Sequence, residues 1–172
     1  RKAGAALPEV VHEGANLSAR GDTAYAAYLS GIVLANAGLG VVHGLASPLG
    51  AEKSIPHGVV CAALLPEASR VIIEKLVDDG KREGKNEPLA KYAAAARALF
   101  DLDEVEDDTE AARRIVSGFR SWIEDFGIPS LSDYGVDERT ARETAKSGGL
   151  KKTPVALDEE EVYRIVVSAA GL

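Results

Sequence analysis

The sequence predicts an all-α protein, one domain built as a bundle of about seven to eight helices. The composition is the first observation behind this prediction: 46% of the 172 residues are hydrophobic but only 5% are aromatic, and alanine is frequent, which favours helices over a β-sandwich. Apolar residues also recur at helical spacing in successive segments. Finally, the chain contains no convincing strand pattern and no internal repeat.

The first two predicted helices precede a glycine-rich region. Residues 2–13 (KAGAALPEVVHE) read as a short amphipathic helix that Gly14 ends, and His12 lies in it as a surface residue among carboxylates. Residues 24–36 read as a second helix, capped by Ser18 or Asp22. Its apolar stripe is more typical of a core or an interface than of cofactor contacts: Tyr25, Tyr28, Leu29, Ile32 and Val33.

The next stretch, residues 37–70, is AGLGVVHGLASPLGAEKSIPHGVVCAALLPEASR. Such dense glycine in an apolar helical pattern indicates close approach to another helix or to a ligand. We expect a helix that Pro48 and Gly50 end, and a second helix that begins at Pro56 and continues to residue 77. His43 and His57 would then face each other across a helix–loop–helix corner. They form either a two-point metal clamp or, as is commoner, a pair of hydrogen-bonded core histidines.

The remaining segments alternate between polar connections and helices. Residues 78–88 are predicted to be an exposed loop, and the acidic residues 101–108 a linker, because DLDEVEDD lacks the glycine and closing glutamate of a calcium loop. Residues 131–136 are expected to be irregular, and Gly148, Gly149 and Pro154 to break the chain. Helices are predicted at 89–100, 109–126 (strongly amphipathic), 137–146 and from Asp158 to Ala170, where acidic residues suit the first turn.

Charge and cysteine content limit the partners and the compartment. The net charge of −7 and pI near 5.0 argue against nucleic acid or an anionic membrane as a partner. No apolar run approaches the roughly 20 residues of a membrane span, and no signal peptide is visible, so we expect a cytoplasmic protein. Cys61 permits no internal disulfide, and its apolar neighbours favour a buried structural thiol over a reactive one.

Three motifs, GLGVVHGLASPLG, IPHGVV and LLP, lie between residues 38 and 66. They resemble the signature of the iron-containing (group III) alcohol dehydrogenases. The resemblance implies a dehydroquinate synthase-like C-terminal domain in which His43 and His57 match the last two of four ligands to a divalent metal, Fe2+ or Zn2+. It also implies an alcohol or carbonyl substrate of low molecular weight.

The chain departs from the family pattern at two positions. Ser47 stands where the family commonly has a histidine with an orienting or proton-relay role, and we treat Ser47 as the position of that catalytic residue. Glu67 stands where the family often has a histidine after LLP. Neither change removes a metal ligand, but the first bears on catalytic competence or substrate choice.

Several family elements are missing from these residues. The chain has no glycine-rich phosphate loop after a strand, no βαβ pattern and no DxxxH element. We therefore expect residues 1–172 to be a single helical metal-binding domain, with NAD(P) bound only through an absent N-terminal domain that would be its partner. Residue 1 is not expected to be the natural start, since the chain has no methionine, and the chain alone is expected to be inactive.

Two other functions stay open at this stage. One is a non-redox relative of the same architecture, and the other is a helical interaction domain that has lost catalysis, with Ser47 as the hint. The sequence also leaves the oligomeric state open, including a homo-oligomer.

Overall fold

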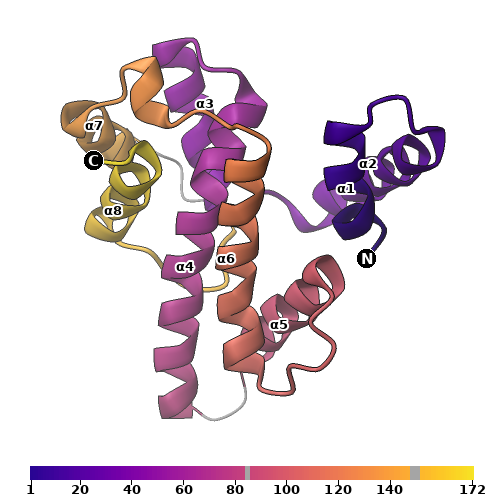
Figure 1. Ribbon diagram of the computed structural model, residues 1–172. Helices are drawn as coiled ribbons and strands as arrows, with labels where there is room; N and C mark the ends of the chain where they lie inside the picture. Colours follow the sequence, from indigo (N-terminus) through magenta and orange to yellow (C-terminus); the bar gives the residue numbers. More distant parts are fainter. Residues whose placement is uncertain (84–85, 148–151) are drawn as a thin grey trace.

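The computed structural model describes residues 1–83, 86–147 and 152–172 and is all-α (Figure 1). Within these residues there are eight α-helices, one short 3-10 helix and no strand, which confirms the predicted fold class. The helices are α1 (Lys2–His12), α2 (Leu17–Ala37), α3 (Val41–Lys53), α4 (His57–Glu83), α5 (Glu87–Phe100), α6 (Asp108–Asp125), η1 (Leu131–Tyr134), α7 (Glu138–Ser147) and α8 (Glu159–Ala170).

The long helix α4 is the centre of the arrangement (Figure 1). Helices α3, α6 and α8 all pack on it, while α5 packs mainly on α6, and α7 packs on α8 and α3. Val60, Leu64 and Ile73 on α4 are buried, each at most 1% exposed, because apolar residues at helical spacing give one face that these neighbours cover. The corner between α3 and α4 is thereby held on a packed core.

The polar stretch at residues 78–88 was predicted to be a loop. This was wrong for residues 78–83, because α4 continues to Glu83, and for residues 87 and 88, because α5 begins at Glu87. Extending an existing helix needs no new nucleation, so a polar segment can continue it. Residues 84 and 85 lie outside the described part of the chain. Helix α5 then starts after Asn86, whose side chain accepts a hydrogen bond from the Leu89 N–H at 3.0 Å and donates to the Leu76 carbonyl of α4.

The predicted end of α3 was also wrong. Helix α3 continues past Pro48 and Gly50 to Lys53, and it ends at Ser54 in the left-handed region (φ 55°). Leu45 and Leu49 on either side of the proline are fully buried, so packing against α4 outweighs the local preference of proline to end a helix. Helix α4 begins at His57, one residue after the predicted start at Pro56, and the Pro56 carbonyl accepts from the Val59 and Val60 N–H groups.

Smaller corrections concern the caps and the irregular segments. The N-cap of α2 is Asn16, which accepts from the Ala19 N–H at 3.1 Å, and not Ser18 or Asp22. Residues 131–134, predicted to be irregular, form the 3-10 helix η1. The predicted break at Gly148 and Gly149 lies outside the described residues. The acidic cap of the last helix is confirmed, with Asp158 and Glu161 forming a capping box.

Helices α1 and α2 form a hairpin at the side of the bundle (Figure 1). Helix α2 packs chiefly on α1, and α1 packs on α5 at Gly4, where a Cβ would lie 2.0 Å from the Leu99 carbonyl oxygen. The apolar stripe of α2 does not enter the core, and its large side chains are between 41% and 66% exposed: Tyr25, Tyr28, Leu29, Ile32 and Val33. We call these five residues the α2 apolar face.

One further observation concerns helix length and composition. No single described helix is long and apolar enough to cross a membrane, although α2 and α3 meet that test as a pair, bent by 102° at the break between them.

Candidate metal centre

The centre is built at the corner where α3 gives way to α4. Gly38 ends α2 with φ 82°, a conformation that favours glycine, and this turn leads into the first residues of α3. His43 is the third residue of α3, and His57 is the first residue of α4. The two imidazole rings lie with centroids 5.4 Å apart and planes tilted by 52°, so the rings face each other across the corner as their spacing predicted.

Cys61, predicted from its apolar neighbours to be a structural thiol, brings a third donor atom to the same place. It lies four residues after His57 on α4, so the two side chains share one face of the helix. Its Sγ is 3.4 Å from His57 Nε2. The donor atoms of His43, His57 and Cys61 all lie within 4.8 Å of one another. The His-x-x-x-Cys spacing was the sequence signal that could have revealed this.

Burial shapes the chemistry of the thiol. The Cys61 side chain is partly buried, and this burial raises the pKa of the thiol, so without a cation nearby it is a neutral S–H group. Cysteine binds metals as the thiolate, which a cation stabilises. Two imidazole nitrogens and one sulfur form a donor set that fits a borderline divalent cation such as Zn2+ or Fe2+.

A cavity of about 440 Å³ opens beside these donors, with His43 and Cys61 on its wall. Most of its lining is apolar, as at Val41, Leu65 and Ile72, while Ser69, Tyr92, Lys152 and Thr153 add polar groups. Burial raises the pKa of the Tyr92 hydroxyl, which therefore stays protonated and able to donate a hydrogen bond. Such a space suits a small organic molecule with an apolar body and one polar end.

Ser47 lies one turn after His43 on α3 and is exposed. Its hydroxyl donates a hydrogen bond to the His43 carbonyl oxygen at 3.4 Å. Ser47 is not one of the described residues that line the cavity. Ser47 is thus close to His43 along the helix but is bonded to its backbone and not to its imidazole.

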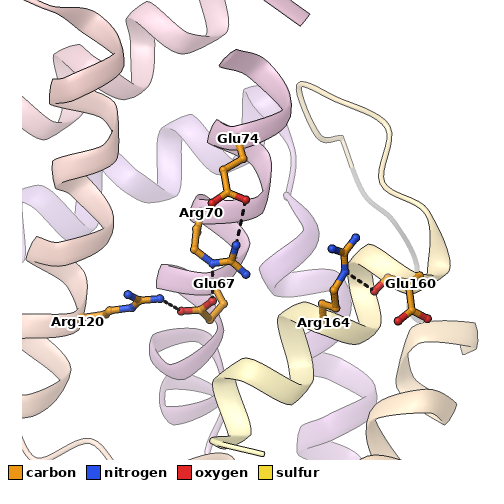
Figure 2. Close-up of polar contacts among 6 residues, drawn as sticks. All are labelled: Glu67, Arg70, Glu74, Arg120, Glu160 and Arg164. Atoms are coloured by element: carbon orange, nitrogen blue, oxygen red, sulfur yellow. Dashed lines mark hydrogen bonds and ion pairs between the residues drawn. The ribbon is translucent and has the colours of Figure 1, made fainter. Parts of the chain in front are cut away.

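Glu67, the second departure from the family pattern, belongs to an electrostatic contact between α4 and α6 and not to the metal centre (Figure 2). Glu67 is only 7% exposed, and its carboxylate accepts hydrogen bonds from Arg70 Nε at 2.9 Å and from Arg120 on α6. Arg70 also donates to Glu74 at 3.0 Å. Burial alone would raise the pKa of Glu67, but the two guanidinium groups outweigh it and lower the pKa, so the group stays ionised.

On the other side of α4, the last helix carries further contacts of this kind. Figure 2 shows Arg164 reaching back along α8, where its Nε donates to the Glu160 carbonyl at 3.4 Å. The Glu160 carboxylate accepts from Arg142 on α7 at 2.6 Å, and Lys75 on α4 pairs with Glu161 on α8 at 2.8 Å. The contact of Arg142 joins α7 to α8, and the contact of Lys75 joins α8 to the helix that carries His57 and Cys61.

Comparison with known proteins gives consistent matches. A sequence profile of the C-terminal part of the Fe-containing alcohol dehydrogenase family matches residues 3–170. The chain is 34% identical to the 1,3-propanediol dehydrogenase of Klebsiella pneumoniae over 168 residues, which cover 92% of this chain and 39% of that protein. It is 29% identical to long-chain-alcohol dehydrogenase 1 of Geobacillus thermodenitrificans over 169 residues, 95% of this chain and 40% of that protein.

A solved structure gives the same result in three dimensions. The crystal structure of a 1,3-propanediol oxidoreductase superposes with a TM-score of 0.84 at 30% sequence identity, covering 98% of this chain and 42% of that chain. The present chain therefore spans about two fifths of the length of the relatives that it matches.

Proposed function

The chain belongs to the Fe-containing alcohol dehydrogenase family, and we propose that it is the metal-binding part of an NAD(P)-dependent alcohol dehydrogenase. The parent enzyme would interconvert an alcohol with an aldehyde or ketone. The observation that carries the proposal is the pair His43 and His57, which meet at one corner with ring centroids 5.4 Å apart beside an apolar cavity. The two named relatives, a 1,3-propanediol dehydrogenase and a long-chain-alcohol dehydrogenase, support the class of reaction.

His43 and His57 would hold a divalent cation, Fe2+ or Zn2+, through their imidazole nitrogens. When bound, such an ion supplies a Lewis acid for an alcohol or carbonyl oxygen, while a nicotinamide cofactor takes up or gives the hydride. The part of the protein described here would contribute no dinucleotide site, because none of its described residues forms a strand. NAD(P) would bind through the remaining part of a parent of the relatives' length.

The cavity would orient the organic substrate. Its apolar wall, with Leu65 and Ile72, would cover the hydrocarbon part of an alcohol and exclude water from it. The neutral Tyr92 hydroxyl and the Ser69 hydroxyl would be the hydrogen-bonding groups on the wall. Ser47, with no ionisation near neutral pH, would only accept or pass on a hydrogen bond, so proton transfer at that point would depend on water.

The α2 apolar face would be the contact surface for the rest of the parent chain. The matched part of the family is its C-terminal part, so in the relatives the additional length precedes it, and the corresponding segment would reach residue 1 at the start of α1. Helix α2 lies directly beside α1 in the hairpin (Figure 1). Apolar side chains that are 41–66% exposed gain by being covered, and the preceding segment would be the nearest polypeptide available.

The test uses a full-length parent enzyme that carries these 172 residues. We expect His43→Ala and His57→Ala each to remove metal, measured by elemental analysis, and to bring NAD(P)-dependent oxidation of a short alcohol to background. The matched control is His12→Ala, since His12 lies at the surface and pairs with Asp125 at 2.9 Å on α6. Metal content and activity that survive both substitutions at the corner would show that the ligands lie elsewhere.

A further inference from the structure

We propose that Cys61 is a third protein ligand of the metal centre, so that this chain offers two imidazole nitrogens and a thiolate sulfur to one cation. This inference rests on the proposed roles of His43 and His57 and adds a donor to them. A centre of this kind favours Zn2+ and other thiophilic cations, because thiolate is a soft ligand. Mg2+ and Mn2+ prefer hard ligands such as carboxylate and water and should bind more weakly.

The positions of the three donors support the proposal. In a tetrahedral zinc site with bonds of about 2.0–2.3 Å, the ligand atoms lie roughly 3.3–3.6 Å apart. Cys61 Sγ and His57 Nε2 already have this separation, at 3.4 Å. The third donor, on His43, is no further than 4.8 Å from either, so a movement of about 1.5 Å or less would complete the set.

The packed helices that carry these donors fix the positions of the donors relative to one another. Cys61 and His57 are fixed relative to each other by one turn of α4, and Val60 and Leu64 on either side of Cys61 are fully buried. His43 approaches from α3, whose Leu45 and Leu49 are buried in the same core. These three donors come from two packed helices and would fill only part of the coordination of a cation, so positions remain for the ligands of the preceding part of the parent.

Coordination also accounts for the position of the thiol at the cavity. Cys61 lines the cavity together with His43, so a cation held by these groups would be accessible from the space that suits a small organic molecule. The S–H bond is replaced by a sulfur–metal bond, and the proton passes to solvent. No oxidant or reductant is needed for this step.

The single cysteine makes the experiment selective. Co2+ replaces Zn2+ as a visible probe, and a thiolate–cobalt bond gives a charge-transfer absorption in the near ultraviolet that imidazole ligands do not give. Because Cys61 is the only cysteine of the chain, this band can come from no other residue. The 172-residue chain is titrated with Co2+ under a non-thiol reductant, and Zn2+ is then added to displace the probe.

We expect a saturable band at one Co2+ per chain, lost on addition of Zn2+ but not of Mg2+ or Mn2+. Cys61→Ser and Cys61→Ala should abolish the band and weaken Co2+ binding by at least about 10–100-fold. This is the usual loss of metal affinity when a residue that only hydrogen-bonds to a ligand is removed, so loss of a ligand should cost at least as much. Circular dichroism of both variants shows whether the helices are retained. His12→Ala is the control and should change neither band nor affinity.

The outcomes separate the two proposals. Co2+ binding that depends on His43 and His57 but shows no charge-transfer band, and is unchanged in both Cys61 variants, would overturn the role of Cys61 and leave the proposed function standing. Binding that is unchanged by His43→Ala and His57→Ala would overturn both.

Discussion

Replacement of Glu67 with glutamine tests whether the contact between α4 and α6 stabilises the fold that positions His43 and His57. Glutamine keeps the size of the side chain but removes its negative charge. The buried carboxylate accepts from Arg70 on its own helix and from Arg120 on α6, and α6 carries the apolar face that packs on α4. Glu67→Gln therefore weakens one defined contact between two central helices.

The expected loss can be estimated from the exposure of the partners. Hydrogen bonds to charged groups contribute about 1.5–3 kcal/mol each, and breaking a fully buried ion pair costs about 3–5 kcal/mol. The Arg120 side chain is 52% exposed, and Arg70 keeps its contact with Glu74, so water and Glu74 recover part of the loss. We expect the free energy of unfolding to fall by about 2–3 kcal/mol, which lowers Tm by about 4–12 °C in a chain of this size.

The effect should depend on pH with a defined sign. The pKa of Glu67 is lowered in the folded state and is about 4.3 in the unfolded chain. A carboxyl group of this kind stabilises the fold above its unfolded pKa, and the contribution is lost as pH falls through the folded pKa. The difference between wild type and Glu67→Gln should be full at pH 7 and should shrink as the pH falls below about 4.

The assay is urea unfolding followed by circular dichroism, at pH 7 and at several lower values. Glu110→Gln is the matched control, because Glu110 pairs with Arg114 on the exposed surface of α6 at 2.9 Å, where a salt bridge contributes only about 0–1 kcal/mol. Equal losses for the two variants, or a Glu67→Gln loss that does not change with pH, would refute the reasoning.

Three further predictions follow from the packing and from the site. Gly118→Ala should reduce the free energy of unfolding by about 1–3 kcal/mol, since a Cβ at this position would lie 2.5–2.6 Å from the Phe100 ring. Gly21→Ala, where a Cβ would have nothing within 4 Å, should be neutral or stabilise by up to about 1 kcal/mol. Thermal unfolding of the two variants compares these effects. Calorimetric titration of the 172-residue chain with NADH or NADPH should show no saturable heat at micromolar concentration, and a saturable signal would contradict the proposal that NAD(P) binds only through the remaining part of the parent. In the parent enzyme, Ser47→His should raise kcat, because general acid–base help contributes typically about 10²–10⁴-fold, and should add a pH dependence near about 6.5. A tenfold fall in kcat (roughly 1.4 kcal/mol) with metal content unchanged would instead show that this enzyme's reaction is adapted to the serine.

Much of the architecture could be predicted because the determinants are local. Helical spacing and capping residues such as Asp158 place most helices, and Pro56 with the preceding turn places the corner between α3 and α4. From this corner the facing of His43 and His57 followed directly. Their role as metal ligands stays a proposal, since it comes from the family resemblance and from the donor chemistry.

The errors have tertiary causes. Pro48 does not end α3, because the buried leucines on both sides hold the helix on α4, and no local rule contains that packing energy. The stripe of α2 is exposed in the described chain, so it does not pack in this core, and the expected alternative of an interface stays a prediction. The nearness of Cys61 to His43 could not be predicted from its apolar neighbours, because it depends on a contact between two helices.

The uncovered face of α2 has a consequence for how stability is distributed along the chain. The hairpin joins the bundle mainly through α1 and α5, so its opening leaves the packing of α3, α4, α6, α7 and α8 in place, and it should behave as a separate cooperative unit of low local stability. Whatever covers the α2 apolar face then binds the closed hairpin and not the open one. By mass action, binding of a partner to the α2 apolar face and closing of the hairpin are therefore linked equilibria. Amide hydrogen exchange in α1 and α2 would slow in proportion to how well the partner covers the face.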